Sequence, residues 1–209
     1  MMKIESVASQ PDRAGRHAVR FSDGTVMRLY RQTIEDFSIY TGMELSDDEI
    51  QQLKTAASAM SAKMRAVRIV AASSVSEREL EHRLVQKGED PQQAKAAVAW
   101  MSDMQLIDDR KTAEQIVNRC ISKGYGLSRA KQMLYEKRVP KQYWEDALAQ
   151  YPDQSESIIS YLSSRLSEDS DTKEIKRTVD ALIRKGHHYG TIRKCLEQLT
   201  FDTEDFPEA

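Results

Sequence analysis

Apolar positions follow two different spacings along the chain, and the change between them divides it. Near the N-terminus, Val19 and Phe21 alternate with polar neighbours, and Met27 and Leu29 do so again after an Asp-Gly turn. This pattern predicts a β-hairpin. An extended segment over residues 3–9 would add a third strand, because an isolated hairpin is marginally stable in water. We therefore expect a small N-terminal β-meander.

The segment after the meander is predicted to change to helix. Residues 35–40 are expected to form a short helix that Gly42 ends. Ser46 and Glu49 have the spacing of a capping box, in which each residue satisfies a free backbone N–H of the next helix. The long helical part of the chain should begin here.

From about residue 51 onward, apolar residues recur at the three- and four-residue spacing of one helix face. Helix starts are marked by capping residues or prolines: Ser76 with Glu79, Asp90 with Pro91, Pro140, and Asp171 with Glu174. The apolar stripes are Ala94, Ala97, Val98 and Met101; Ala113, Ile116, Val117 and Cys120; Trp144, Ala147, Leu148 and Tyr151; Ile192, Cys195, Leu196 and Leu199. Each helix should bury one face.

One short motif occurs three times in this helical part, as Leu84-x-x-Lys87-Gly88, Leu134-x-x-Lys137-Arg138 and Leu182-x-x-Lys185-Gly186. A lysine near a helix C-terminus followed by glycine in the left-handed conformation is a common helix ending. The near-constant period predicts tandem repeats, each with three helices. The predicted divisions are 1–57 for the β-meander and short helices, 58–108, 109–152 and 153–199 for the repeats, and 200–209 for an acidic tail.

Charge is unevenly distributed although the formal net charge is only -2. Residues 110–150 hold nine Lys or Arg against four Asp or Glu, and residues 171–199 hold seven against four. Residues 31–59 are acidic instead, with two against six. A nucleic-acid or other polyanionic partner would therefore meet local patches in the last two repeats rather than the field of the whole molecule.

The basic residues of the last two repeats are the predicted contact surface for a partner or for DNA, although a solvated helix face is an equally good interpretation. The predicted basic strip consists of Arg119, Lys123, Arg129, Lys131, Lys137, Arg138, Lys141, Arg177, Arg184, Lys185, Arg193 and Lys194. Trp144, Tyr151 and Tyr161 are expected in the core or between repeats rather than as exposed platforms for base stacking.

Other candidate chemistry has a simpler structural interpretation in each case. Asp108-Asp109 could hold a divalent cation, but its place before a helix favours a cap made by Asp109. The cluster Lys123-Gly124-Tyr125-Gly126 is expected to be a helix–helix turn rather than a phosphate loop. The histidines, which lack a metal-ligand spacing, are expected to be polar surface groups or phosphate contacts: His17, His82, His187 and His188.

The two cysteines, Cys120 and Cys195, fall on apolar stripes and are expected to be buried thiols. No nucleophile or nucleotide-binding motif occurs in the sequence, so we expect a protein without enzymatic activity, cofactor or metal. No apolar run approaches a membrane span, and we expect a cytoplasmic protein.

Together with the repeats, two motifs resemble the RecX family of bacterial recombination regulators: Leu106-Ile107-Asp108-Asp109 and Arg119-x-x-x-Lys123-Gly124-x-Gly126. The resemblance also includes Gly42-x-Glu44-Leu45-Ser46 and Ser76-x-Arg78-Glu79-Leu80 and covers most of the chain. Two residues depart from the family's pattern. Gln105 and Arg138 stand where the family commonly has glycine, so the geometry of these turns is in question.

This resemblance implies a mainly α-helical, elongated and curved body of three repeats. It implies a monomer that binds the RecA recombinase on single-stranded DNA, binds DNA itself weakly at most, and restrains ATP hydrolysis and strand exchange. DNA repair, recombination and the SOS response would be regulated in this way. Two alternatives remain: a protein that binds nucleic acid directly, since three-helix units also occur in helix-turn-helix proteins, and an adaptor for another partner.

Overall fold

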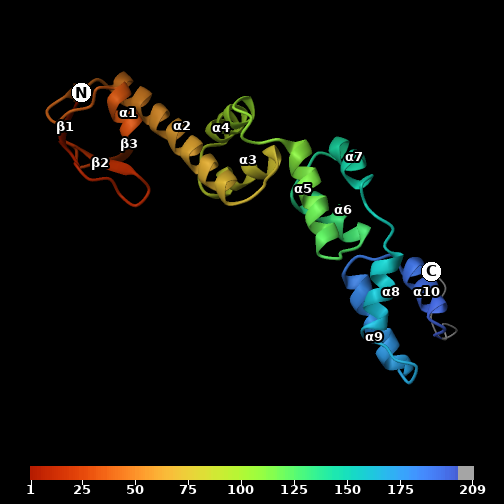
Figure 1. The fold of residues 1–209 in the computed structure, drawn as a ribbon. Helices are drawn as coiled ribbons and strands as arrows, with labels where there is room; N and C mark the ends of the chain where they lie inside the picture. Colours follow the sequence, from red (N-terminus) through yellow and green to blue (C-terminus); the bar gives the residue numbers. More distant parts are fainter. Residues whose placement is uncertain (202–209) are drawn as a thin grey trace. The chain divides into compact units, whose positions relative to one another are not determined.

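The computed structural model describes residues 1–201 and is mostly helical, with a small N-terminal sheet (Figure 1). The elements are, in order, β1 (Met2–Val7), β2 (Arg16–Phe21), β3 (Val26–Tyr30), α1 (Arg31–Asp36), β4 (Glu44–Leu45), α2 (Asp47–Ala72), α3 (Glu77–Gln86), α4 (Pro91–Asp103), α5 (Asp109–Ser122), α6 (Leu127–Glu136), the 3₁₀ turn η1 (Lys141–Tyr143), α7 (Trp144–Leu148), α8 (Ser155–Ser163), α9 (Thr172–Arg184) and α10 (Tyr189–Gln198). The prediction of a mainly α-helical chain with a small N-terminal β element is confirmed. The acids of the predicted tail lie outside the described residues.

The sheet is antiparallel, with the strand order β3-β2-β1-β4. The predicted hairpin is present as β2 and β3, and Gly24 turns it with a φ of 83°. Alternation buries one face, because Ile4, Val19, Phe21 and Leu29 are at most 1% exposed. The predicted meander is therefore confirmed.

The segment between the sheet and α2 differs from the prediction. The short helix α1 begins at Arg31, directly after β3, and not at residue 35. Its residue Ile34, together with Phe37 and Ile39 beyond its end, packs on the core of the sheet, which fixes its position better than local propensity does. Gly42 does not end this helix. It turns the chain with a φ of 96°, and its N–H donates to the carbonyl of Ile4, which sets β4 beside β1.

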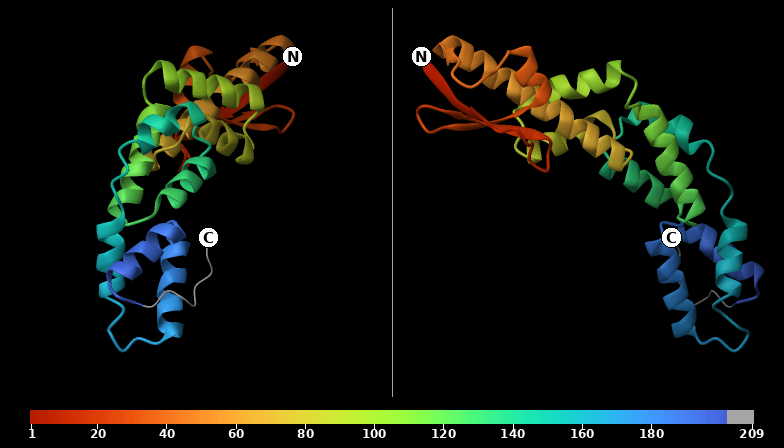
Figure 2. Two further views of the ribbon diagram at one scale, coloured as in Figure 1. Left: turned by 90° about the vertical axis from the view of Figure 1, so that its right-hand side faces the viewer. Right: turned by 60° about the vertical axis from the view of Figure 1, so that its left-hand side comes forward.

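Helix α2 runs along the sheet, as Figure 2 shows. The predicted capping box of Ser46 and Glu49 begins this helix. Near the other end, the Arg68 guanidinium donates to the carbonyl of Ala14 at 2.7 Å and to the Tyr30 hydroxyl at 3.1 Å. Helix α2 also packs against α4, so it links the sheet to the first helices of the body.

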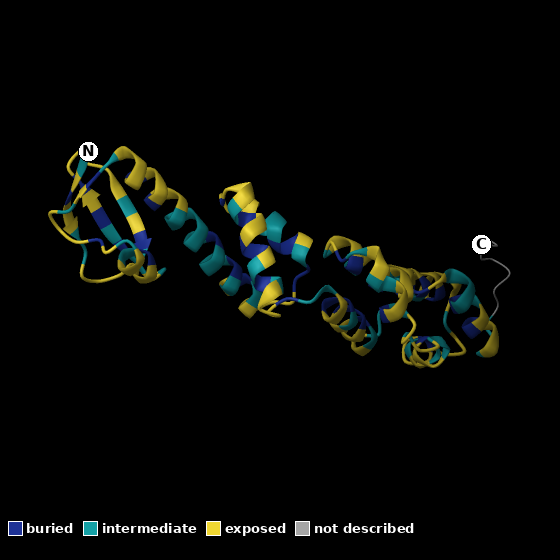
Figure 3. Cartoon of the chain, turned by 90° about the horizontal axis from the view of Figure 1, so that it is seen from above, coloured by how far each residue is buried: buried dark blue, intermediate teal, exposed yellow. Residues whose placement is uncertain are grey.

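The helices from α2 onward fall into three triplets, α2–α4, α5–α7 and α8–α10, and in each triplet the first and third helices are in contact. The second and third triplets each have a core of their own. Figure 3 shows the buried residues on one face of these helices and the exposed residues on the other. The division of the chain into three repeats stays a prediction, and its first boundary, 57/58, falls inside the continuous helix α2.

By internal contacts the described chain forms two compact units. The first unit consists of residues 1–73 and 80–107, and the second of residues 74–79 and those from 108 onward. The first turn of α3 thus belongs to the second unit. Within residues 1–201, no helix is both long and apolar enough to span a membrane.

Candidate functional site

The first turn of α3 is joined to the end of α6 by side-chain hydrogen bonds. The buried Ser76 hydroxyl accepts from the N–H of Glu79 at 3.1 Å, as the predicted cap requires, and donates to the carbonyl of Lys137 at 2.7 Å. The N–H of Glu77 donates to the Asp109 carboxylate at 2.8 Å. A helix start and the turn after another helix, far apart in sequence, are thereby held together. We call this contact the open junction.

The turn at this junction contains a strained residue. Arg138 has a φ of 53°, whereas Gly88 and Gly186, at the same place in the motif, have φ values of 86° and 87°. The N–H of Val139 donates to the carbonyl of Leu134, which completes the usual left-handed helix ending. A side chain in this conformation costs about 1 kcal/mol relative to glycine. Arginine in place of glycine at this position of the motif therefore gives the turn a different geometry, as the sequence indicated, and costs stability.

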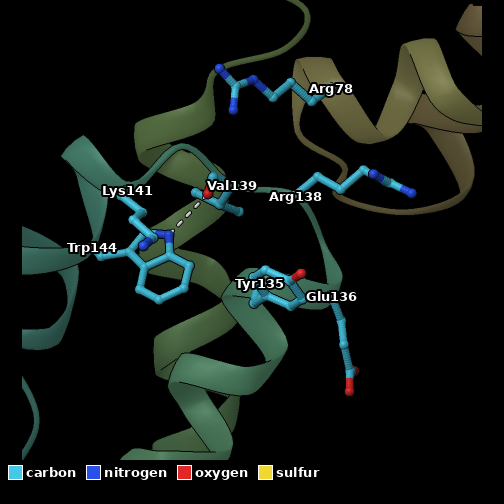
Figure 4. Close-up of a pocket in the computed structure, with 7 residues that line it drawn as sticks. All are labelled: Arg78, Tyr135, Glu136, Arg138, Val139, Lys141 and Trp144. Carbon is cyan, nitrogen blue, oxygen red and sulfur yellow. Dashed lines mark hydrogen bonds between the residues drawn. The ribbon is translucent and has the colours of Figure 1, made fainter.

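A pocket of about 450 Å³ opens beside this turn, and every residue that lines it belongs to the second unit (Figure 4). The lining residues are Arg78, Tyr135, Glu136, Arg138, Val139, Lys141 and Trp144. The Trp144 indole N–H donates to the carbonyl of Val139 at 3.0 Å, which holds the ring in place. The Tyr135 side chain is 73% exposed. The pocket thus has aromatic walls and three cationic groups.

The electrostatics of the pocket are positive. Its one carboxylate, Glu136, accepts from the Gln132 amide at 2.8 Å and lies 3.8 Å from the Arg129 guanidinium. Figure 4 shows this side chain extending away from the other six. Arg138 Nε lies 3.5 Å from the Glu79 carboxylate. For Arg78 and Lys141, no ion pair is present within residues 1–201. An anionic group would therefore be favoured in this pocket.

A second junction, between α6 and the turn after α9, is made by backbone atoms. The N–H of Gly126 donates to the carbonyl of Lys185 at 2.8 Å, and the N–H of Ser128 donates to that of Gly186 at 3.2 Å. A Cβ on Gly126 would lie 2.0 Å from the Gly186 oxygen. We call this contact the closed junction, because it leaves no space for a side chain at either glycine.

His187 completes the closed junction. Its Nε2 lies 3.1 Å from the carbonyl of Gly124 and must carry the proton to donate, while the buried Nδ1 has no partner within the described residues. Burial lowers the pKa of His187, an effect that the bond to Gly124 partly opposes. The neutral ring is therefore the form that the fold accommodates.

The structure brings only some of the predicted basic strip together. Arg138 and Lys141 meet at the pocket, and Arg129 and Lys185 at the closed junction. Arg129 and Arg193 form ion pairs with Glu136 and Glu197. The other members are on helices or at helix ends of the second unit: Arg119 and Lys123 at the end of α5, Lys131 on α6, Lys137 after it, Arg177 and Arg184 on α9, and Lys194 on α10. None of the twelve is buried, and their common role stays a prediction.

Sequence reasoning missed Arg78 and Tyr135 as members of the site. Arg78 could not be placed because the residues that it meets follow almost 60 positions later. Trp144 does pack on the core of its triplet, as do Tyr151 and Tyr161 on theirs, so this prediction is confirmed. Trp144 also reaches the pocket, which the periodicity of the sequence does not reveal.

A second basic groove, of about 410 Å³, lies in the first unit and was also missed. Its cationic residues are Arg65, Arg68, Arg83 and Lys87. The sequence does indicate a basic surface here, because residues 50–76 contain four Lys or Arg and no acid. These arginines have structural partners, since Arg65 Nε lies 2.7 Å from the Glu89 carboxylate and Arg68 bonds to the sheet. The groove is thus explained by packing.

The acidic pair has a different role from the predicted one. Asp108, and not Asp109, caps α5 by accepting from the N–H of Lys111, and this bond lowers the pKa of Asp108. The pKa of Asp109 is raised by burial, although its bond to Glu77 opposes the shift. The extended backbone of Asp108 makes this residue the N-cap of α5, one position earlier than predicted. The Asp109 carboxylate can therefore accept from the N–H of Glu77 at the start of α3. In the described part of the chain, no cluster of three potential metal ligands occurs.

The remaining candidates are structural groups. Cys120 and Cys195 are buried free thiols, as predicted, and burial raises the pKa of both. The histidine prediction was wrong for two residues, because His17 and His187 are buried and bond to main-chain carbonyls. The predicted turn at Gly124 is confirmed by a φ of 62°, and the N–H of Gly126 is already engaged at the closed junction.

Comparison with known proteins supplies relatives for the whole chain. Regulatory protein RecX of Clostridioides difficile (strain 630) is 24% identical over 210 residues, which cover 97% of each chain. Regulatory protein RecX of Vibrio parahaemolyticus serotype O3:K6 is 26% identical over 155 residues, or 73% of this chain and 98% of that protein. No family model matches the chain.

Solved structures agree with these relatives in fold. A crystal structure of regulatory protein RecX covers 94% of this chain and all of its own, with a TM-score of 0.63 and 19% identity. A crystal structure of RecX from Lactobacillus salivarius covers 69% of this chain with a TM-score of 0.59 and 23% identity. In sequence the chain is thus similar, over most of its length, to proteins named regulatory protein RecX, and it shares the fold of the solved RecX structures.

Proposed function

We propose that this protein binds the RecA recombinase on single-stranded DNA and inhibits its ATP hydrolysis, recombinase activity and filament assembly. The observation that carries the proposal is the relationship to proteins named regulatory protein RecX over nearly the full length of the chain. The protein acts by binding and catalyses no reaction. DNA repair and recombination in the cytoplasm are then the processes that it regulates.

The surface chemistry of the second unit supports this proposal. The open junction gathers Arg78, Arg138 and Lys141 around one pocket, and further exposed cations lie on the neighbouring helices. Such a surface complements the acids of a protein partner or the phosphates of its DNA. A protein that binds one state of a filament more tightly than another shifts the population toward that state without any chemical step.

The test is single-stranded-DNA-dependent ATP hydrolysis by RecA of the same organism, titrated with the full chain. The proposal predicts strong inhibition at well below one chain per RecA, because a filament can be stopped from few sites. Fluorescence anisotropy of the same labelled DNA without RecA runs in parallel. Hydrolysis that stays unchanged at equimolar chain would contradict the proposal.

The second candidate is a protein that acts on nucleic acid without RecA. One observation favours it, namely the combination of Tyr135 and Trp144 with three cations in the pocket, since aromatic rings and basic groups together bind single strands. Tight binding to bare DNA with a steep salt dependence, and no effect on RecA, is the result that this candidate predicts.

A further inference from the structure

We infer that the pocket of the open junction binds one nucleotide of a single-stranded nucleic acid. Tyr135 and Trp144 supply aromatic surface for the base, and Arg78, Arg138 and Lys141 supply charge for the flanking phosphates. The inference rests on the proposed function for the source of the strand, which a RecA filament presents. It adds to that function the ligand of one site on the protein, a nucleotide of the strand.

The pocket contains a strained residue, Arg138. The other two turns of the motif have glycine at this position, with nothing within 4 Å of a Cβ on Gly88 and no room for one on Gly186. The second turn has Arg138 instead, at a φ of 53°. Strained residues cluster at binding sites, where the side chain does something that glycine cannot. Here the side chain adds a guanidinium to the pocket.

The pocket keeps an excess of positive charge after its internal ion pairs are counted. Arg138 lies 3.5 Å from Glu79, while Glu136 is engaged by Gln132 and Arg129 on its own helix. Arg78 and Lys141 are both exposed. Guanidinium groups hold phosphate through paired N–H donors, and a lysine adds a point charge. The excess positive charge thus suits a phosphodiester.

The pocket also has an exposed aromatic ring, that of Tyr135. Among residues 1–201, Tyr135 is the most exposed aromatic side chain, at 73%. In Figure 4 the Tyr135 and Trp144 rings lie on one side of the Val139 turn, and Arg78 lies on the other. An aromatic ring that is mostly exposed buries little surface in the free protein, and it can stack on a base of any identity. The two aromatic rings therefore favour nucleic acid over an acidic peptide as the ligand of the pocket.

The size of the pocket selects single strands. A volume of about 450 Å³ is in the ordinary range for one small ligand. In a duplex the faces of the bases are covered by their neighbours, so only an unpaired base can reach the rings. The site should therefore discriminate strongly against duplex DNA of the same length.

Trp144 provides a direct reporter for the test. The chain has two tryptophans, so W100F leaves Trp144 as the only indole. We would titrate this variant of the full chain with a short deoxythymidine oligonucleotide, with a duplex of equal length, and with polyglutamate. The expected result is a change in Trp144 fluorescence with the single strand, much less with the duplex, and none with polyglutamate.

Variants of the pocket give the second part of the test. Tyr135→Ala should weaken oligonucleotide binding about tenfold, through loss of one stacked base. Arg138→Gly should weaken binding about fivefold and reduce the slope of log K against log salt by about 0.7, which corresponds to one phosphate contact. The matched controls are Gln105→Gly, at another left-handed non-glycine residue with a φ of 54°, and Lys95→Glu, an exposed charge on α4.

Three results would overturn the inference: no change in Trp144 fluorescence, polyglutamate binding as tight as the oligonucleotide, or Arg138→Gly and Tyr135→Ala binding like the controls. The measurement contains no RecA, so it is independent of the proposed function. RecA inhibition by a protein whose pocket fails the test leaves the proposed function standing. Oligonucleotide binding at the pocket without any effect on RecA would contradict the proposed function but not the inference about the pocket.

Discussion

The open and closed junctions use the same parts of the motif in opposite ways. In both, the start of one helix meets the turn of a Leu-x-x-Lys motif about 60 residues later, Ser76 with Lys137 and Gly126 with Lys185. Where the contact runs through a serine side chain, a pocket with three cations remains. Where it runs between the backbones of two glycines, no space remains. The same structural element thus leaves a pocket open in one place and packs tightly in the other.

The largest effect is expected from Gly186→Ala at the closed junction. A Cβ there would lie 2.4 Å from the backbone nitrogen of Arg129, and the residue has a φ of 87°. Overpacking and left-handed strain together should lower the free energy of unfolding by about 3 kcal/mol. Urea denaturation of the full chain would measure this loss.

The matched control is Gly124→Ala in the same unit. This glycine is also left-handed, with a φ of 62°, but nothing lies within 4 Å of its Cβ. Only the backbone cost of about 1 kcal/mol should appear. Equal losses for the two variants would show that the closed junction is not tightly packed.

The next effect is expected from Ser76→Ala at the open junction. The change removes the part-buried bond to the carbonyl of Lys137 and the buried bond that caps the N–H of Glu79. A loss of about 2 kcal/mol in the free energy of unfolding follows from one cap and one orphaned carbonyl. Ser46→Ala, which removes a cap without a distant partner, should cost about half as much. If the two variants lose the same free energy, the contact to Lys137 contributes nothing.

His187 should make the stability of the closed junction depend on pH, because its pKa is lowered in the folded state. Its pKa is lowered in the folded state from the ordinary 6.5, so the unfolded state binds more protons in the window below that value. The free energy of unfolding should therefore decrease as the pH falls from 7 toward 5, by at most about 1.4 kcal/mol per pH unit for one group. Denaturation curves of wild type and His187→Gln across this range isolate the effect. Parallel pH profiles for the two proteins would rule it out.

The smallest effect on stability is expected from Arg138→Gly. Relief of the left-handed strain gains about 1 kcal/mol, and loss of the ion pair with Glu79 costs a similar amount. The free energy of unfolding should stay within about 1 kcal/mol of wild type. A loss above about 2 kcal/mol would mean that Arg138 is retained for the fold and not for a ligand.

Local signals predicted much of the fold. The hairpin, the capping residues Ser46, Asp90 and Asp171, and the glycine turns at Gly88 and Gly186 all follow from rules that act within a few residues. The start of α1 and the strand β4 could not be predicted in the same way. Both are set by packing on a sheet whose partners are distant in sequence.

The candidate site was less accessible to prediction from the sequence. The concentration of Arg138 and Lys141 is visible as charge, and the departure of Arg138 from glycine is visible in the motif. Arg138 and Lys141 lie beside Arg78 because Ser76 bonds to the carbonyl of Lys137. This contact joins residues 61 positions apart, so the spacing of apolar residues cannot predict it. The exchange of roles between Asp108 and Asp109 has the same cause, since the distant N–H of Glu77 attracts the second carboxylate.

The most direct test of the account is binding of the full chain to RecA filaments assembled on immobilised single-stranded DNA. The comparison is wild type against a variant with Lys131, Lys141, Arg184 and Lys194 changed to Glu; for none of these is an ion pair present within residues 1–201. The account predicts that wild type binds and that the variant, with an unchanged melting temperature, binds at least about tenfold more weakly. Absence of wild-type binding, or equal binding by a folded variant, would contradict it.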